Sequence, residues 1–248
     1  CIADSDVLLF AKGIASVKKF QVDVFEAKVD TLAIQGPKSE KLMEKVFGKE
    51  IINLKFFKFD YFMFNKRKYL ISKSGFSKQG GFEIHTDNIE GALKLYDYFF
   101  EIGEEFNLKP GTPNHPERIE GGLLSYGSDM DIFDNPFECG FDKYVDLSSN
   151  IFYLAKQKLK EIKENGIKRK LMGVKIESKS IDVSQSIPIL DLQNNEIGEL
   201  RSGAFSPKFK KIVGIAMIKK NFCNVNESFQ VKLNGNLIKG EICSLPIL

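Results

Sequence analysis

Apolar and polar residues alternate in two different rhythms along this chain, and the rhythm changes at about residue 168. Before that point, helical spacing is interleaved with short strand-like runs. After it, short apolar segments are separated by turns, which is typical of small β domains. The pattern predicts an α+β fold with two parts, residues 1–167 and residues 168–248.

Helices are expected where apolar residues recur every three or four positions. In chain order, the expected helices cover residues 3–20, 38–48, 89–106, 116–127 and 154–166. Ser5 or Asp6 would cap the first helix, and Asp87 with Glu90 has the spacing of a capping box before the third. The fourth would place three apolar side chains on one face, namely Ile119, Leu123 and Tyr126.

Strands are expected where apolar and polar residues alternate. The expected strands cover residues 21–27, 31–35, 68–76 and 82–86, the last two forming a hairpin. Asn234-Gly235 between alternating segments predicts a second hairpin. Between residues 56 and 64, six aromatic residues cannot all face one core at a period of two, so some are available to line a pocket: Phe56, Phe57, Phe59, Tyr61, Phe62 and Phe64.

Composition narrows the functional classes. Hydrophobic residues make up 43% of the chain and charged residues 28%, which is typical of a globular protein. The net charge is only +3 and the charges are interspersed, which argues against nucleic acid as the partner. Four scattered cysteines and two histidines argue against a metal site and favour a reducing compartment. No apolar run approaches the roughly 20 residues that span a bilayer, and there is no signal peptide, so a cytoplasmic protein without a membrane partner is expected.

The common nucleotide-binding and hydrolase motifs are absent. A Ser/His/Asp triad would require His85 or His115 as its base. His115 lies between Asn114 and Pro116, where a turn at the start of a helix explains it better. A triad is therefore disfavoured.

Two adjacent glycines, Gly80 and Gly81, precede an expected strand whose polar face carries Glu83 and His85. One interpretation is a hairpin loop with a solvated outer face. The alternative is that the glycines let the backbone approach a flat ligand, with Glu83 holding one edge of it. The residues alone leave both interpretations open.

Two further charged residues have two interpretations each. Arg118 is either a surface salt-bridge residue or points inward to fix a carboxylate or the region of Glu83. Glu138, in "NPFECGF", is either a loop-stabilising acceptor of backbone N–H groups or a functional carboxylate, and the first interpretation is favoured.

Five segments, in order, resemble motifs of the glycine-cleavage T-protein, or aminomethyltransferase, family. They are "LAIQGPKSEKLM", "SGFSKQGGFEI", "RIEGGLLSYG", "NPFECGF" and "GELRSGAFSPKFKKIVGIAMI", and they span residues 31–218. The family's usual forms are L-x-x-Q-G-P, Y-T-G-E-D-G-x-E-I, R-L-E-A-G-x-x-x-Y-G, P-x-E-A-G-L and T-S-G-x-x-S-P. Within the family, "KFFKFDYF", "DNPFECGFDKYV" and "GIAMIKK" resemble the dimethylsulfoniopropionate (DMSP) demethylase branch.

The resemblance implies folate-binding α/β lobes followed by a C-terminal β-barrel domain, with tetrahydrofolate as the cofactor. The implied reaction moves a methyl group from the DMSP sulfonium to folate N5, giving methylmercaptopropionate and 5-methyltetrahydrofolate. No metal is implied, and a homodimer is compatible with it. The alternatives are a glycine-cleavage-type aminomethyltransferase and a non-catalytic folate-binding relative.

The resemblance also implies site residues. Glu83 would pair with the pterin edge, Gly81 would leave room for the ring, and Arg118 would have a supporting role. Phe57 would form a wall of the substrate pocket, and His85 would hydrogen-bond the DMSP carboxylate.

Several features depart from the family pattern. Phe56 would form the wall of the substrate pocket in place of Phe57 if the motif were aligned one residue earlier. His85 stands where the demethylase branch would have Tyr, and Asn114 stands where aminomethyltransferases carry a folate-contacting Arg. The family's catalytic Asp would lie upstream of Cys1, so the 248-residue chain by itself is expected to be inactive.

Overall fold

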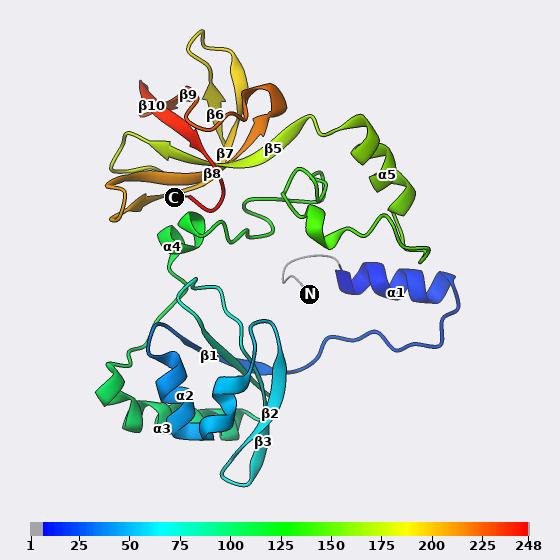
Figure 1. Ribbon diagram of the computed structural model, residues 1–248, viewed down its shortest axis with the longest axis vertical. Coiled ribbons are helices and arrows are strands. Elements are labelled where there is room, and N and C mark those ends of the chain that lie inside the picture. The colour runs from blue at the N-terminus through cyan, green and yellow to red at the C-terminus, as the bar shows by residue number, and fades with distance from the viewer. Residues whose placement is uncertain (1–6, 248) are drawn as a thin grey trace. The chain divides into compact units, whose positions relative to one another are not determined.

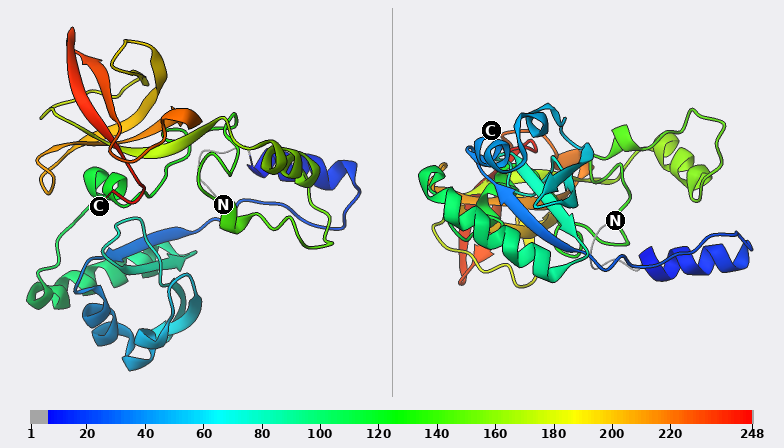
Figure 2. Two further views of the ribbon diagram at one scale, coloured as in Figure 1. Left: turned by 45° about the horizontal axis from the view of Figure 1, so that its top comes forward. Right: turned by 90° about the horizontal axis from the view of Figure 1, so that it is seen from below.

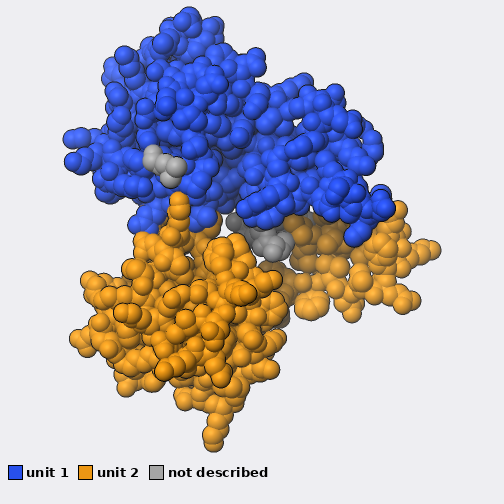
Figure 3. Space-filling view, viewed as in Figure 1, with its two compact units in different colours: residues 1–4, 115–248 blue, residues 5–114 orange. Residues whose placement is uncertain are grey.

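The structure, a computed structural model, describes residues 7–247. These form two compact units that divide between Asn114 and His115 (Figure 3). We call residues 7–114 the sheet unit and residues 115–247 the barrel unit. The change of sequence pattern at residue 168 coincides with the start of the first barrel strand, and a domain boundary at that point stays a prediction.

Four antiparallel strands form the sheet unit's single sheet, in the order β1-β4-β3-β2 (Figure 1). The strands are β1 (Asp30–Gln35), β2 (Phe59–Phe64), β3 (Arg67–Ser72) and β4 (Gly81–Thr86). The helices of this unit are α1 (Val7–Val17), α2 (Ser39–Phe47) and α3 (Ile89–Gly103), with short 3-10 turns η1 (Lys49–Asn53) and η2 (Glu104–Phe106).

Alternate residues of each strand face α2 and α3. Phe82 and Ile84 of β4 are fully buried and pack with Leu42 of α2 and with Leu95 and Phe99 of α3. The other residues of each strand lie on the opposite face, which we call the outer face. By register this face carries Thr31, Ala33, Gln35, Phe59, Tyr61, Met63, Lys68, Leu70, Ser72, Gly81, Glu83 and His85.

The aromatic segment before and within β2 divides between the two faces, as its period requires. Phe62 and Phe64 pack against the core, whereas Phe59 and Tyr61 remain 64% and 50% exposed on the outer face. The expectation that these rings do not all face one core is therefore confirmed, and a pocket lined by the exposed ones stays a prediction.

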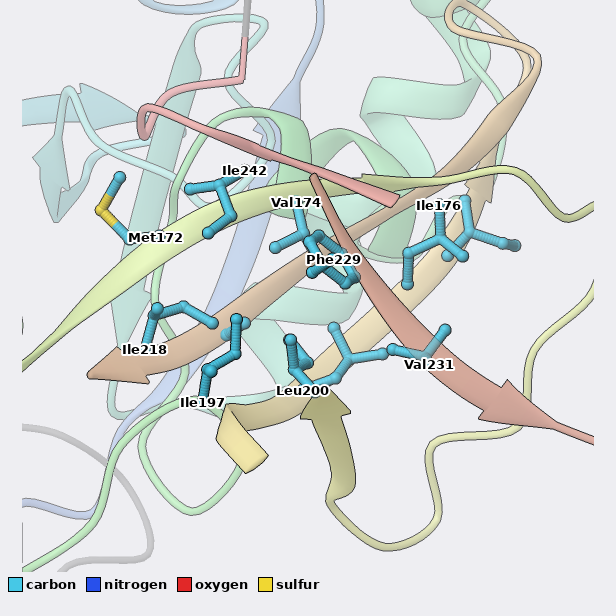
Figure 4. Close-up of a cluster of buried hydrophobic side chains, with 12 residues drawn as sticks. Met172, Val174, Ile176, Ile197, Leu200, Ile218, Phe229, Val231 and Ile242 are labelled. Atoms are coloured by element: carbon cyan, nitrogen blue, oxygen red, sulfur yellow. The ribbon is translucent and has the colours of Figure 1, made fainter. Parts of the chain in front are cut away.

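Six antiparallel strands close into the barrel of the barrel unit, in the order β10-β5-β8-β7-β6-β9. They are β5 (Arg169–Ile176), β6 (Ile187–Leu190), β7 (Glu196–Ser206), β8 (Lys211–Lys219), β9 (Ser228–Leu233) and β10 (Asn236–Cys243). Inward-facing side chains fill the barrel, with Leu200, Ile218 and Phe229 fully buried (Figure 4). The remaining elements of this unit are α4 (His115–Glu120), α5 (Lys156–Asn165), η3 (Asp142–Tyr144) and η4 (Lys220–Phe222).

The hairpin predicted at Asn234-Gly235 is confirmed between β9 and β10. Both turn residues have positive φ, +48° and +83°, as the tight two-residue turn requires. The hairpin of β3 with β4, the helix ending at Gly48 and the helix ending at Gly166 are confirmed as well.

The strand expected at residues 21–27 is wrong. This segment runs without hydrogen-bonded strand structure between α1 and β1 (Figure 2), and Val22 and Phe25 are exposed. Alternation alone does not make a strand, because a strand also needs a neighbouring edge to pair with. Among the described residues, β1 pairs only with β4.

One helix end and one helix cap also differ from expectation. The helix expected over 116–127 ends at Glu120, because Gly122 takes a φ of +64° and the Gly122 N–H bonds to the Ile119 carbonyl. Helix α3 is capped by Asn88, whose side chain accepts from the Gly91 N–H, while Asp87 instead pairs with Arg67 at 3.0 Å.

The described cysteines behave as small apolar residues. Cys139 and Cys243 are buried and Cys223 is half-buried, and no disulfide joins them. Burial raises the pKa of the Cys139 thiol to about 11, with Asp134 and Glu138 adding to the effect. Within residues 7–247, no group of three or more His, Cys, Asp or Glu side chains could hold a metal ion, and no helix is long and apolar enough to cross a membrane.

Candidate functional site

The outer face places Glu83 and His85 on β4 beside two strands. Glu83 lies opposite Ala33 of β1 and Ser72 of β3, and His85 lies opposite Thr31 and Leu70. Both side chains are half-buried. Strand alternation therefore puts a carboxylate and an imidazole on one sheet face, as the sequence predicted.

One Glu83 oxygen is held by the turn that follows β3. Ser74 Oγ donates to Glu83 Oε2. Among residues 7–247, the other oxygen, Oε1, has no hydrogen-bond partner. The carboxylate is thus fixed at one oxygen and available at the other, which suits a ligand that presents N–H donors.

Both ring nitrogens of His85 are already engaged. Nδ1 lies 3.0 Å from Thr31 Oγ1, and Nε2 lies 3.4 Å from Ser72 Oγ. A substrate carboxylate that bonded His85 would have to replace one of these two hydroxyl groups. The role of His85 in binding DMSP stays a prediction.

Gly81 lies against β1 of its own sheet. A Cβ atom on Gly81 would come within 2.4 Å of the Ile34 carbonyl oxygen and 2.6 Å of the Gln35 side chain, and φ is +154°. Gln35 in turn binds the loop between β3 and β4, because its Nε2 donates to the carbonyls of Ser74 and Phe82. The close approach at Gly81 is therefore to the protein's own backbone, and its role toward folate stays a prediction.

Phe57 has an unusual backbone conformation for an aromatic residue, with φ of +57°. Its N–H donates to the Lys73 carbonyl at 2.9 Å, which places Phe57 beside the end of β3 that carries Ser72 and Ser74. The ring is 73% exposed and lies 4.3 Å, centroid to centroid, from the ring of Phe56. A strained, exposed aromatic residue at this position is compatible with a pocket wall.

Replacing Phe57 by asparagine should separate binding from stability. Asn tolerates positive φ, so the free energy of unfolding should stay the same or rise by up to about 1 kcal/mol. If the ring stabilises a sulfonium, its loss should weaken DMSP binding by about 0.5–2 kcal/mol. Urea denaturation tests the first effect, and the KM for DMSP of the complete gene product tests the second. A loss of DMSP binding in Phe56→Ala but not in Phe57→Asn would move the wall to Phe56.

Arg118, in α4 of the barrel unit, points inward and fixes a carboxylate. Its side chain is 5% exposed, and Nη1 lies 2.5 Å from Oδ2 of the fully buried Asp129. Nη2 donates to Ser202 Oγ at 3.1 Å, and Nε donates to His115 Nδ1 at 3.3 Å. The inward-pointing interpretation of Arg118 is therefore correct, and the carboxylate that it fixes is that of Asp129. A supporting role toward folate stays a prediction.

His115 is a partner of Arg118 and not a catalytic base in this arrangement. Burial lowers the pKa of His115, the Arg118 guanidinium lowers it further, and Asp129 opposes the shift. A neutral imidazole leaves Nδ1 free to accept from Arg118. Within the described residues no triad is built on it.

Glu138 stabilises its own loop, as the sequence favoured. Its Oε2 accepts from the Asn135 N–H at 3.2 Å, and its Oε1 accepts from Arg169 Nε at 3.3 Å. Arg169 also pairs with Asp134. These bonds tie the segment before η3 to β5.

Comparison with known proteins decides the family. Residues 2–149 match the family described as "GCVT N-terminal domain", and residues 169–248 match the "Glycine cleavage T-protein C-terminal barrel domain". The chain belongs to the glycine-cleavage T-protein family.

Two curated relatives show the extent of the sequence similarity. The chain is 35% identical over 220 residues to dimethylsulfoniopropionate demethylase DmdA of Ruegeria pomeroyi, covering 89% of this chain and 60% of the relative. It is 31% identical over 222 residues to an aminomethyltransferase of Bacillus cytotoxicus, covering 88% of this chain and 60% of the relative. The chain therefore spans about 60% of the length of the curated relatives it matches.

A solved structure confirms the fold. The glycine cleavage system aminomethyltransferase T from Bartonella henselae superposes with a TM-score of 0.79 at 22% identity, covering 96% of this chain and 66% of that one. The expected T-protein-like α+β fold with a C-terminal barrel is confirmed by this likeness and by the six-stranded barrel itself.

A polar cavity of about 700 Å³ lies in the barrel unit of this T-protein family member. Its lining includes His115, Glu199, Arg201 and residues 181–186. Arg201 donates to Glu199 and Asp134 within the protein. None of the five residues that the sequence predicts for the site lines this cavity.

Sequence reasoning missed three hydroxyl side chains at the candidate site, those of Thr31, Ser72 and Ser74. Ser72 and Ser74 stand at alternate positions after the apolar part of β3, on the same side as Glu83. The spacing was visible, but only the register between strands shows that these hydroxyl groups meet Glu83 and His85.

Proposed function

We propose that the protein is a tetrahydrofolate-dependent methyltransferase that takes a methyl group from the sulfonium of DMSP. The observation that carries the proposal is Glu83, whose carboxylate is fixed at one oxygen and available at the other on a sheet face with exposed aromatic rings. Similarity to a DMSP demethylase over 89% of the chain supports this choice of substrate.

The residues of the outer face fit a folate. Glu83 can accept hydrogen bonds from adjacent N–H groups on the edge of a flat heterocycle. Phe59 and Tyr61 provide exposed rings on the same face, and Phe57 provides one beside it. Aromatic rings can also stabilise a sulfonium cation.

Tetrahydrofolate, when bound, supplies N5 as the nucleophile. The S–CH₃ bond breaks as the N5–CH₃ bond forms, the electron pair of the S–C bond stays on sulfur, and the N5 proton is released to solvent. The products are methylmercaptopropionate and 5-methyltetrahydrofolate, and the atoms balance without an oxidant or reductant. Because a sulfonium is already activated, the chain's residues need chiefly to bind and orient the two reactants.

Assay of the complete gene product tests the proposal. With DMSP and tetrahydrofolate, it should form 5-methyltetrahydrofolate and methylmercaptopropionate, both detectable by mass spectrometry. The aminomethyl-lipoyl carrier of glycine cleavage should not replace DMSP. Turnover with that carrier and none with DMSP would contradict the proposal and favour an aminomethyltransferase.

Replacing Glu83 by alanine should weaken tetrahydrofolate binding. Loss of a charge-assisted hydrogen bond is expected to cost about 1.5–3 kcal/mol of binding free energy. Isothermal titration calorimetry measures the change, with Glu50→Ala in η1 as a control that should leave the affinity unaltered. Equal affinities of the Glu83→Ala variant and the wild type would assign Glu83 to a solvated strand face.

A further inference from the structure

A continuous run of hydrogen bonds on the outer face ends at Glu83. Thr31 Oγ1 lies 3.0 Å from His85 Nδ1, and His85 Nε2 lies 3.4 Å from Ser72 Oγ. Ser72 Oγ lies 2.7 Å from Ser74 Oγ, which donates to Glu83 Oε2. We call these five side chains the hydroxyl–imidazole chain. They come from β1, β4, β3 and the turn after β3, and strand pairing holds them in register.

With an ionised Glu83 and a neutral His85, the number of available hydrogens fixes the direction of every bond in this hydroxyl–imidazole chain. An ionised carboxylate only accepts, so Ser74 directs its one hydroxyl hydrogen to Glu83. Ser74 Oγ then accepts from Ser72. Since Ser72 has no second hydrogen, the bond to His85 needs Nε2–H as its donor, and the bare Nδ1 accepts from Thr31.

One competing bond exists, and geometry disfavours it. Ser72 Oγ also lies 3.5 Å from the Glu83 carbonyl oxygen, at the limit for a hydrogen bond. If Ser72 donated there, the Ser72 and Ser74 oxygens would stand 2.7 Å apart with no hydrogen between them. The directed chain from Thr31 to Glu83 satisfies the four other contacts and leaves only this 3.5 Å contact without a hydrogen.

We propose that Ser72, Ser74 and His85 are positioning residues that hold the Glu83 carboxylate in the orientation that binds folate. This inference rests on the proposed function. A glutamate side chain has three rotatable bonds, so fixing Oε2 by a donor orders the carboxylate before a ligand arrives and leaves Oε1 to accept from it. Such pre-organisation raises affinity by removing an ordering cost from the binding step.

The tautomer of His85 gives a test that needs no ligand. The chain has only two histidines, so imidazole ¹⁵N signals of the full chain can be assigned with an His85→Gln variant. The wild type should show the Nε2–H tautomer at His85. Ser72→Ala removes the acceptor and should shift the tautomer balance, whereas Ser77→Ala should not. An Nδ1–H tautomer in the wild type would overturn the proposal.

Tetrahydrofolate affinity supplies the second test. Ser74→Ala should weaken binding about tenfold, as for a lost hydrogen bond to a charged group, whereas Ser74→Thr keeps the hydroxyl and should stay within about threefold of the wild type. Ser77 is a matched control, because its hydroxyl donates to Gln35 from the same loop and is outside the hydroxyl–imidazole chain. Ser77→Ala should change the affinity less than about twofold.

A double-mutant cycle separates positioning from direct contact. In a Glu83→Ala background, Ser74→Ala should have no further effect on affinity, because it acts through the carboxylate. The same tenfold loss in both backgrounds would overturn the positioning role. If the wild type shows the Nε2–H tautomer but no saturable folate binding, both the proposed function and the positioning role are wrong. The hydrogen-bond directions in the hydroxyl–imidazole chain are then still supported.

Discussion

Replacing Arg118 by alanine should destabilise the barrel unit by about 3–5 kcal/mol, because it leaves the buried Asp129 carboxylate without its counter-charge. Asp129 is fully buried, and its Oδ2 also accepts from the Ser125 N–H at 2.6 Å. Its Oδ1 has no hydrogen-bond partner within the described residues. Because Asp129 is buried, solvent cannot compensate its charge once the guanidinium is removed. Urea denaturation should therefore show the full loss in the free energy of unfolding, and amide hydrogen exchange in the barrel strands should show the same loss.

Two variants make this expectation specific. Lys211→Ala removes an ion pair of the same unit that is exposed, with Nζ of Lys211 3.5 Å from Glu177, and should cost less than about 0.5 kcal/mol. The pair Arg118→Met with Asp129→Leu removes both charges and should recover part of the stability that Arg118→Ala loses. If Arg118→Ala were as stable as the wild type but bound folate weakly, Arg118 would be a ligand-binding residue instead of a structural one.

Replacing Gly81 by alanine should destabilise the sheet unit by about 2–4 kcal/mol. The new methyl group would meet the Ile34 carbonyl oxygen at 2.4 Å, and the backbone would keep an unfavourable positive φ. Since the obstacle is backbone of a paired strand, it cannot move aside without breaking the pairing of β1 with β4. Urea denaturation monitored in the sheet unit measures the loss.

The neighbouring glycine is the matched control. A Cβ atom on Gly80 would meet no atom within 4 Å, so Gly80→Ala should cost only the strain of positive φ, about 1 kcal/mol. This comparison answers the question raised by the paired glycines in the sequence. If Gly81→Ala kept full stability and lost only folate affinity, the glycine would serve the ligand and not the sheet.

Local patterns predicted most elements, because each depends on residues close together in sequence. The hairpin at Asn234-Gly235 needs only two residues that accept positive φ, and α2 needs only its apolar period and Gly48. The strand predicted at residues 21–27 was wrong for the opposite reason, because strand pairing depends on the free edge of another strand that lies far away in the sequence. Alternation of apolar and polar residues shows which face of a strand each side chain would occupy. It does not show whether a partner strand is present.

The candidate site was predictable only in part, for the same reason. Glu83 and His85 follow from one strand and one motif. The partners that hold His85, Thr31 and Ser72, lie on other strands, and Ser74, which holds Glu83, lies in the turn after β3. The inward turn of Arg118 depends on Asp129 and Ser202. Register and burial are properties of the folded chain, and a single sequence without aligned relatives does not contain them directly.

The closure of the barrel sets an order of events during synthesis. All strands of the sheet unit lie within residues 30–86, so their pairing can be completed early as the chain emerges. The barrel instead closes by pairing β5 with β10, for example Val174 with Ile242, near the two ends of its sequence. Until β10 has left the ribosome, β5 and β9 each present an open edge, and such edges are sites of aggregation. A chaperone that shields nascent strands would therefore matter most until β10 has been translated.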